Sequence, residues 1–310
     1  MSQVKIYEKI KNFNKSLTIE GDKSLSIRWA LLSSQSSSKC KSYNLLLSED
    51  VISTLNCLKK LGVKVKIQKN YCEIHGVGLN GFKYKKDLIL NAGNSGTLGR
   101  LIMGLLVHSK KNIIIKGDKS LSNRDFLRVA SPLKKFGAKI LTNSGKLPVK
   151  IKGTDKATPI EYNERRGSAQ CKSSVMLAAL NTNGETIIKA KKSRNHSELL
   201  FEHLNLPIKI KKEGNYDLIK IKGKSKIPQL NYKIPSDISS SAFFIVLTAL
   251  SKNSKLRIKN VNINSSRTGI LNILKMMGVK IKKVNTRIYK GEKIADLVIK
   301  SSKNFKSINC

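Results

Sequence analysis

Four stretches of the chain combine a start rich in Ser, Thr or Gly with an apolar run of helical length. They read KSLSIRWALLSS, NSGTLGRLIMGLL, SAQCKSSVMLAAL and SSSAFFIVLTAL. An apolar run of this length behind a polar start predicts a buried helix with an N-cap. The four stretches lie near Ser26, Thr97, Gln170 and Ser241, at intervals of 71, 73 and 71 residues. The pattern therefore predicts a chain built from repeats of about 70 residues.

A second helix followed by a short strand recurs with the same period. The four copies are LKKLGVKVKI (58–67), LKKFGAKILT (133–142), LFEHLNLPIKI (200–210) and LKMMGVKIKK (274–283). Three of them carry Gly where the helix would end, which suits a left-handed C-cap. The alternation of Val63, Val65 and Ile67 then has the two-residue period of a strand. Each repeat is predicted to run βαβαββ, so the fold class is α/β (α+β repeats), with four repeat units in this chain.

Two breaks in the repeat pattern predict crossings between two domains. One lies at 17–21, and the other lies at 232–236, where NYKIPSD places a proline before the fourth apolar helix. Residues 1–18 are predicted to be an N-terminal segment that belongs to the first domain. Residues 19–234 are predicted to form a complete domain of three repeats, and residues 235–310 a part of the first domain with one repeat.

Composition changes this picture in two ways. The formal net charge of +40 favours anionic partners. The basic residues are spread along the whole chain without an aromatic-rich stripe, so nucleic-acid binding is kept only as an alternative. Five scattered cysteines, no apolar leader and no apolar run near the length of a membrane span predict a cytoplasmic protein. The four histidines show no metal-ligand spacing.

Arginine is informative here because lysine is the default cation. Six of the ten arginines lie in or beside the repeated helix starts: Arg28, Arg100, Arg124, Arg128, Arg194 and Arg267. A helix N-terminus offers free N–H groups to an anion, and arginine adds a planar fork that lysine cannot replace. Capping is the alternative for each Ser or Thr, and a structural ion pair is the alternative for Arg128 and Arg267. The set predicts a site for phosphate and carboxylate groups.

Two further motifs support such a site. NAGNSGTLGR (91–100) places Gly93, Gly96 and Gly99 around a helix start, where small residues let a ligand approach the backbone. It lacks the Gly-Lys-Ser/Thr ending of a P-loop. GDKSLSIR (21–28) and GDKSLSNR (117–124) differ at one position, and we interpret them as equivalent loops of successive repeats.

These motifs, in this order, resemble the blocks of the 5-enolpyruvylshikimate-3-phosphate (EPSP) synthase family, the 3-phosphoshikimate 1-carboxyvinyltransferases. The blocks are GDKSLSIR, GNSGTLGR, GDKSLSNRDFLRV, SAQCKSSVMLAALNT, SRNHSE, DISSSAFFIV and SRTGILNILKMMGVKI. The resemblance implies a two-domain inside-out α/β barrel with about four of six units present. It also implies transfer of the enolpyruvyl group of phosphoenolpyruvate to the 5-hydroxyl of shikimate 3-phosphate, with release of phosphate, in aromatic amino acid biosynthesis. The implied protein is a monomer with two small-molecule substrates, no metal, no organic cofactor, no nucleic acid and no membrane.

The resemblance also implies roles for individual residues, with Lys23 as the catalytic residue between both substrates. The shikimate 3-phosphate site would comprise Lys23, Ser24, Arg28, Ser168, Ala169, Gln170, Ser193 and Arg194. The phosphoenolpyruvate site would comprise Lys23, Asn94, Gly96, Thr97, Arg124 and Gln170.

The chain departs from the family pattern at three places. The family continues beyond the position of Cys310, and its acid and base carboxylates come from that stretch, so we expect an inactive fragment that binds shikimate 3-phosphate weakly. Asp237 is interpreted as an N-cap and not as a substitute carboxylate. Asp125 stands where the family usually has proline.

Two alternatives remain within ligand-binding proteins. One is the sister transferase that acts on UDP-N-acetylglucosamine, whose reactive-cysteine loop is absent here; Cys171 is interpreted as a packed residue. The other is a non-catalytic anion-binding protein.

Overall fold

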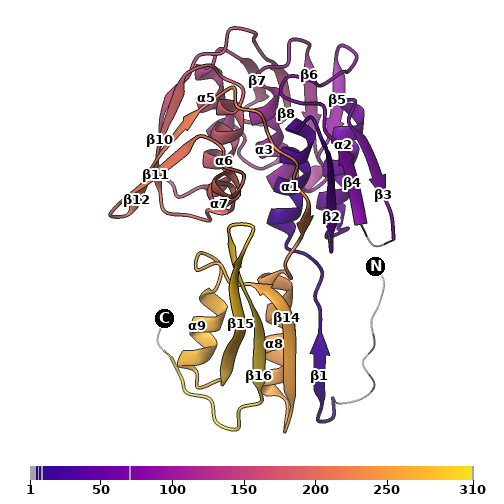
Figure 1. Cartoon of the computed structure of the whole chain (residues 1–310), viewed down its shortest axis with the longest axis vertical. Coiled ribbons are helices and arrows are strands. Elements are labelled where there is room, and N and C mark those ends of the chain that lie inside the picture. Colours follow the sequence, from indigo (N-terminus) through magenta and orange to yellow (C-terminus); the bar gives the residue numbers. More distant parts are fainter. Residues whose placement is uncertain (1–4, 6, 8–9, 70, 309–310) are drawn as a thin grey trace. The chain divides into compact units, whose positions relative to one another are not determined.

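The computed structural model describes residues 5, 7 and 10–308 apart from residue 70, so Cys310 and most of the first nine residues lie outside the described part. The chain folds as two compact units (Figure 1). Unit 1 holds residues 1–22 and 235–310, and unit 2 holds residues 23–234. The division falls at Lys23, later than the predicted residue 19, because Asp22 is bonded into unit 1. Its backbone N–H donates to Pro235 O at 2.8 Å, and its carboxylate pairs with Arg267 at 3.2 Å.

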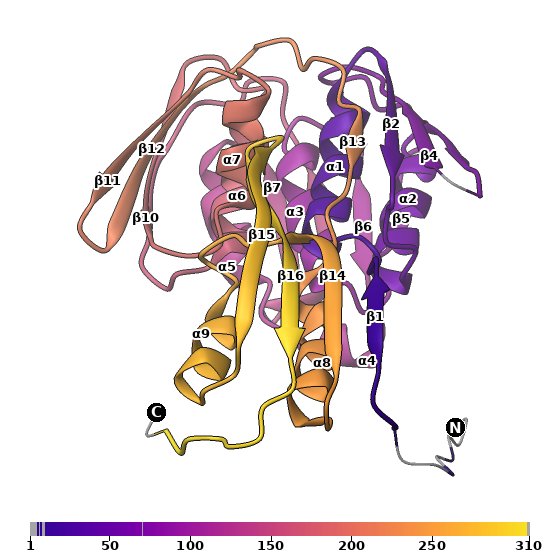
Figure 2. The same cartoon turned by 60° about the horizontal axis from the view of Figure 1, so that its bottom comes forward.

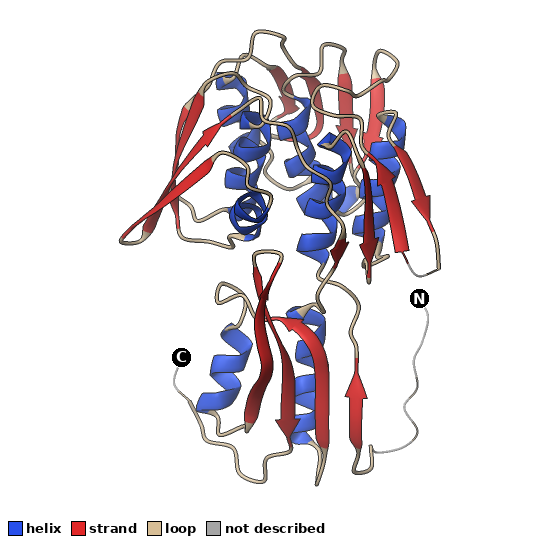
Figure 3. Ribbon diagram, in the orientation of Figure 1, coloured by secondary structure: helices blue, strands red, loops and turns tan. Residues whose placement is uncertain are grey.

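Unit 2 contains three βαβαββ repeats, which confirms the predicted fold class (Figure 3). The first has α1 (Lys23–Gln35), β2 (Lys39–Tyr43), α2 (Glu49–Lys60), β3 (Lys64–Ile67) and β4 (Tyr71–His75), and β13 (Tyr232–Lys233) completes it. The second has β5 (Leu88–Asn91), α3 (Gly96–Leu106), β6 (Ile113–Lys116), a short α4 (Lys119–Ser122), α5 (Leu127–Lys135), β7 (Lys139–Asn143) and β8 (Lys146–Lys152). The third has β9 (Glu161–Glu164), α6 (Ala169–Ala179), β10 (Glu185–Lys191), α7 (His196–His203), β11 (Ile208–Glu213) and β12 (Tyr216–Lys222).

Unit 1 contains one repeat of the same kind. Its elements are β1 (Asn14–Leu17), α8 (Ile238–Leu250), β14 (Lys255–Asn262), α9 (Gly269–Met276), β15 (Ile281–Tyr289) and β16 (Glu292–Lys300). Ile245, Leu271 and Leu297 lie at its core and are fully buried. The opposite face of α8 is exposed, with 79% of Phe243 and 66% of Leu250 accessible to solvent.

All four sheets have the same strand order. The first strand is parallel to the second, the second is antiparallel to the fourth, and the fourth is antiparallel to the third. The orders are β13-β2-β4-β3, β5-β6-β8-β7, β9-β10-β12-β11 and β1-β14-β16-β15. The first strand of two sheets therefore comes from a distant part of the chain, because β13 joins β2 and β1 joins β14.

Left-handed residues end the second helix of every repeat, as the sequence predicts for three of them. Gly62, Gly137 and Gly278 have φ values of +87°, +100° and +89°. Asn205, with φ +51°, has the same position in the third repeat. Asparagine tolerates this conformation better than most side chains, so the missing glycine does not interrupt the pattern.

A second set of glycines brings each closing hairpin over the end of a buried helix. A Cβ on Gly76, Gly153 or Gly223 would lie 2.1, 2.2 or 1.8 Å from a carbonyl oxygen at the C-terminal ends of α1, α3 and α6. Only a residue without Cβ allows such an approach. These three helices form the centre of unit 2 and are buried on nearly all sides (Figure 2).

The two matching octapeptides do not occupy equivalent positions, so that interpretation is wrong. GDKSLSIR opens the central helix α1, whereas GDKSLSNR follows β6 and forms the short α4 before α5. Their separation of 96 residues does not match the repeat period, and the segment equivalent to GDKSLSIR is GNSGTLGR at the start of α3. A shared helix-start composition fits both places because both must cap a helix.

Candidate anion-binding site

The N-terminal ends of α1, α3 and α6 converge in unit 2. Gln170 Nε2 in α6 donates to Thr97 Oγ1 in α3 at 3.0 Å, and Ser174 Oγ donates to Arg100 O at 2.9 Å. Arg28 in α1 donates from Nη2 to Ser173 Oγ in α6 at 3.2 Å. These contacts join the first two turns of each helix to the first two turns of its neighbour, so the three helices run parallel. Their partial positive ends therefore point to one place, which favours an anion there.

Arg100 is almost completely buried in this cluster, with 4% of its surface exposed. Its Nη1 donates to Gln170 Oε1 at 2.7 Å, and Nη2 and Nε donate to the carbonyl of Asp125 at 2.9 and 3.3 Å. The guanidinium also stacks over the Phe126 ring, 5.0 Å from its centroid. Burial, followed by repulsion from Arg128, lowers the pKa of Arg100 to about 10. Arg100 stays charged at neutral pH, and an anion nearby would relieve that repulsion.

Arg124 lies on the second octapeptide and is exposed. Its Nη2 donates to Asn94 Oδ1 at 3.1 Å, while Asn94 Nδ2 donates to Asp118 Oδ2 at 2.6 Å. Hydrogen bonds from the Leu121 backbone and then from Asn94 lower the pKa of Asp118. A Cβ added to Gly96 would lie 3.0 Å from Arg100 Nη1 and 3.4 Å from Arg124 Nη1. Asn94, Gly96, Thr97, Arg124 and Gln170, which were predicted together, therefore lie in one neighbourhood.

Lys23, Ser24 and Arg28 occupy the first two turns of α1. Lys23 is half-exposed, and its Nζ lies 3.4 Å from Asp50 Oδ2. Arg28 is 5% exposed and donates from Nε to Ser197 Oγ at 2.8 Å and from Nη1 to Ser24 O at 3.1 Å. With its bond to Ser173, Arg28 links α1 to both α6 and α7.

The loop before α6 carries the next predicted residues. Ser168 Oγ accepts from Cys171 N at 3.3 Å as the N-cap, and Ala169 begins the helix. The buried Glu164 carboxylate holds this loop by accepting from Ser168 N at 2.9 Å and Arg166 N at 3.0 Å. Cys171 is buried, as predicted, and burial raises the pKa of its thiol.

Ser193 and Arg194 lie in the loop between β10 and α7. Arg194 is exposed, and the buried hydroxyl of Ser193 has no hydrogen-bond partner among the described residues. The place of these two residues in a ligand site remains a prediction.

Two residues that the sequence marked have structural roles. Asp237 Oδ1 accepts from Ser239 N at 2.7 Å and caps α8, which confirms the N-cap interpretation. Arg267 is nearly buried in unit 1 and pairs with Asp22 at 3.2 Å and Asp237 at 3.3 Å. The structural ion pair, one of the two roles left open for Arg267, is therefore observed.

Sequence reasoning missed the acidic and hydroxyl side chains that hold the cluster. Asp125, seen only as a departure from proline, presents its carbonyl to Arg100, and its Oδ1 accepts from Arg128 N at 3.2 Å. Ser173 and Ser197 contact Arg28, although nothing in their spacing links two residues 24 positions apart. The acidic and hydroxyl residues that stand next to the other motifs in the sequence were the signal that could have pointed to these contacts.

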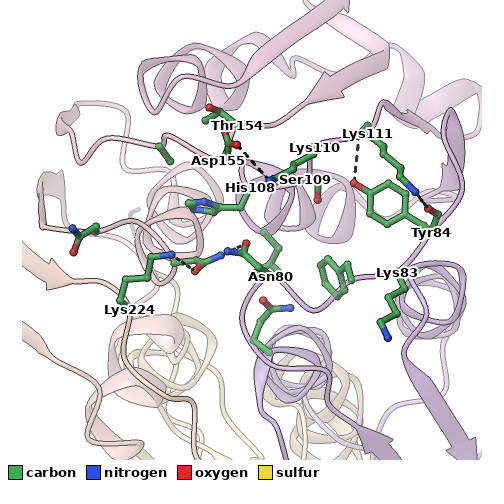
Figure 4. Close-up of a pocket in the computed structure, with 16 residues that line it drawn as sticks. Asn80, Lys83, Tyr84, His108, Ser109, Lys110, Lys111, Thr154, Asp155 and Lys224 are labelled. Atoms are coloured by element: carbon green, nitrogen blue, oxygen red, sulfur yellow. Dashed lines mark hydrogen bonds and ion pairs between the residues drawn. The ribbon is translucent and has the colours of Figure 1, made fainter.

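A cavity of about 660 Å³ lies at the opposite end of the same three helices. Gln35, His108 and Asn181, at or just beyond the C-terminal ends of α1, α3 and α6, line it together with four lysines (Figure 4). Burial lowers the pKa of His108. None of the predicted site residues lines this cavity. Helix C-termini carry partial negative charge, which disfavours an anion, so we place the candidate site at the N-terminal ends.

The described residues contain no group of three or more His, Cys, Asp or Glu side chains able to hold a metal ion. Within the same residues, no helix is both long enough and apolar enough to span a membrane.

Fold and site together define a class: a protein of βαβαββ repeats with a cationic site at converging helix N-termini. The family model for EPSP synthase (3-phosphoshikimate 1-carboxyvinyltransferase) matches residues 7–309. The chain therefore belongs to the EPSP synthase family.

Individual relatives agree with this assignment. A 3-phosphoshikimate 1-carboxyvinyltransferase of Petrotoga mobilis is 40% identical over 94% of this chain and 67% of its own length. The enzyme of that name from Vesicomyosocius okutanii is 40% identical over 93% of this chain and 65% of its own length. A solved EPSP synthase of Acinetobacter baumannii superposes with a TM-score of 0.87 at 37% identity, over 96% of this chain and 67% of that one. The chain spans about two thirds of the length of these relatives.

Proposed function

We propose that this chain binds shikimate 3-phosphate and phosphoenolpyruvate, the two substrates of 3-phosphoshikimate 1-carboxyvinyl transfer, at the converging N-termini of α1, α3 and α6. The observation that carries the proposal is the burial of two arginines at these helix starts. Arg28 and Arg100 are 5% and 4% exposed, in a chain whose cations are mostly lysine on exposed positions. Family membership supports the same reaction.

The proposed reaction joins two anions. A C–O bond forms between the 5-hydroxyl oxygen of shikimate 3-phosphate and C2 of phosphoenolpyruvate, the C–O bond to phosphate breaks, and the hydroxyl proton leaves with the phosphate. Cations and helix N-termini offset the repulsion between the substrates and hold them in contact. In this proposal Lys23 contacts both substrates, Arg28 with Ser168 and Gln170 binds shikimate 3-phosphate, and Arg124 with Gly96 binds phosphoenolpyruvate.

The repeated octapeptide supplies a matched test. Lys23 and Lys119 occupy the same place in GDKSLS, and both are exposed. Lys23→Met is expected to weaken shikimate 3-phosphate binding about tenfold, the usual range for losing one charge-assisted contact, whereas Lys119→Met is expected to change it less than about threefold. Isothermal titration calorimetry measures both, and phosphate release from phosphoenolpyruvate in the presence of shikimate 3-phosphate reports turnover.

Two results would contradict the proposal. Equal losses in both variants would mean that the diffuse positive field, and not a site, attracts the ligand. Retention on DNA that falls steeply with salt, with no shikimate 3-phosphate binding, would favour the nucleic-acid alternative.

A further inference from the structure

A buried ion pair links α6 to α7 beside Arg28. Lys172 Nζ contacts Glu198 Oε1, and their side chains are 0% and 3% exposed. Neither charged group makes a geometrically regular hydrogen bond to another group in the described part of the chain. Within the described part of the chain, the ion pair supplies the opposite charge that each buried group needs.

The residues next to this pair form a second link between the same helices. Ser173 follows Lys172 and Ser197 precedes Glu198, and their hydroxyl oxygens lie 2.7 Å apart. Both hydroxyls also accept from Arg28, at 3.2 Å from Nη2 and 2.8 Å from Nε. The ionic contact and the hydroxyl contact thus fix the spacing of α6 and α7 at the point where Arg28 is held.

A buried ion pair is poor evidence for stability, because desolvation of two charges can exceed their attraction and well-packed apolar residues often do as well. Removing one partner, in contrast, leaves an uncompensated charge. In some proteins a buried ion pair is retained for the geometry it imposes, and a binding group needs neighbours that lock its position. Here the imposed geometry is the distance between the two serines that hold the Arg28 guanidinium.

We propose that Lys172 and Glu198 are positioning residues for Arg28: their ion pair sets the separation of Ser173 and Ser197 and so orients the guanidinium toward the anionic substrate. This inference rests on the proposed function, because it assigns Arg28 to shikimate 3-phosphate.

The neutral double variant Lys172→Met/Glu198→Leu separates positioning from stability. It keeps side-chain volume and removes both charges, so its urea midpoint is expected to equal or exceed that of the unaltered chain. Its dissociation constant for shikimate 3-phosphate is expected to rise about tenfold or more, since small misplacements of a binding group are costly. The control is Lys110→Met/Asp155→Leu, which removes an exposed pair at 3.4 Å near the other end of α3 and should leave binding unchanged.

Trp29 provides a readout that a purely structural role would not move. It is the chain's one tryptophan, follows Arg28 and is fully buried, with its indole N–H donating to Leu230 O at 2.9 Å. The change in its emission on adding shikimate 3-phosphate should shrink in the neutral variant. The reversed pair, Lys172→Glu/Glu198→Lys, should recover part of the affinity.

Glu198→Asp serves as a milder variant in case the neutral one does not fold. It keeps the charge and retracts the carboxylate by one methylene, and we expect about three- to tenfold weaker binding. A folded neutral or Glu198→Asp variant that binds shikimate 3-phosphate like the unaltered chain would overturn the positioning role alone. Failure of the unaltered chain to bind would overturn the proposed function, and this inference with it.

Discussion

At the scale of single residues, the arginines divide into groups that the sequence could not separate. Arg28 and Arg100 are buried, and each donates hydrogen bonds to side chains or carbonyls of other segments. Arg267 is also buried but pairs with two aspartates of unit 1. Arg124 is exposed and is oriented by Asn94. Burial alone therefore does not mark a ligand-binding arginine, and the partners decide the role.

Arg124→Lys tests the exposed member of the site. Lysine keeps the charge but loses the planar fork, so phosphoenolpyruvate affinity should fall about tenfold, or about 1.4 kcal/mol. We expect this moderate loss because Arg124 is exposed in the structure. Titration with phosphoenolpyruvate in the presence of shikimate 3-phosphate measures it, and Arg287→Lys, an exposed arginine of unit 1, is the control. Unchanged affinity would remove Arg124 from the site.

At the scale of elements, the close packing of α3 on α6 sets the position of the site residues. Gly104 is the contact point: a Cβ there would lie 2.1 Å from Ser174 O and 3.2 Å from Leu177 Cβ. The Ser174 carbonyl belongs to the backbone and cannot move aside as a flexible side chain can. The short distance between the axes of α3 and α6 therefore requires glycine at position 104. Thr97 and Gln170 meet because of it.

Gly104→Ala is expected to destabilise unit 2 by about 3 kcal/mol, at the upper end of the usual cost of overpacking. The gain in helix propensity, about 1 kcal/mol, is too small to offset it. Urea unfolding followed by Trp29 emission reports unit 2 directly. Gly269→Ala of unit 1, where nothing lies within 4 Å of the added Cβ, is the control and should leave the midpoint reported by Trp29 unchanged. Equal urea midpoints for the two variants would show that α3 and α6 can move apart to accept the added methyl group without a loss of stability.

At the scale of the whole molecule, each unit has its own core, and unit 1 also has a buried carboxylate that holds several of its segments together, which we call its polar anchor. In unit 1 the anchor is Asp296, whose carboxylate accepts from Arg257 Nη2 at 2.6 Å, from Asn260 N at 2.8 Å and from Asn285 Nδ2 at 3.0 Å. Burial alone would raise the pKa of Asp296, but these hydrogen bonds outweigh it and the pKa is lowered.

The sign of this shift predicts the pH dependence of unit 1. A folded-state pKa below the ordinary value near 3.9 stabilises the fold above that pH, and this stability is lost as pH falls through the folded pKa. Asp296→Asn should therefore destabilise unit 1 by roughly 1–3 kcal/mol at pH 7 and flatten its acid unfolding below about pH 4. Circular dichroism against pH measures this, with Asp217→Asn of unit 2 as the control. A variant that keeps the acid slope of the unaltered chain would contradict the role of Asp296.

The sequence by itself determined the repeat, its elements and its family. Apolar helices near Ser26, Thr97, Gln170 and Ser241 recur because each repeat packs one such helix against its core, and the glycines after the second helices recur because a left-handed turn requires them. These are local signals. The sequence did not determine which first strand joins which sheet, since β13 and β1 pair with strands far away along the chain.

Only the tertiary structure decided which side chains meet. It placed Ser173 and Ser197 on Arg28, Asp125 on Arg100, and Lys172 against Glu198, all across elements that are distant in sequence. It also showed that two nearly identical octapeptides have different places in their repeats. Capping composition reports only that a helix begins, whereas the position of that helix depends on long-range packing, which no local pattern records.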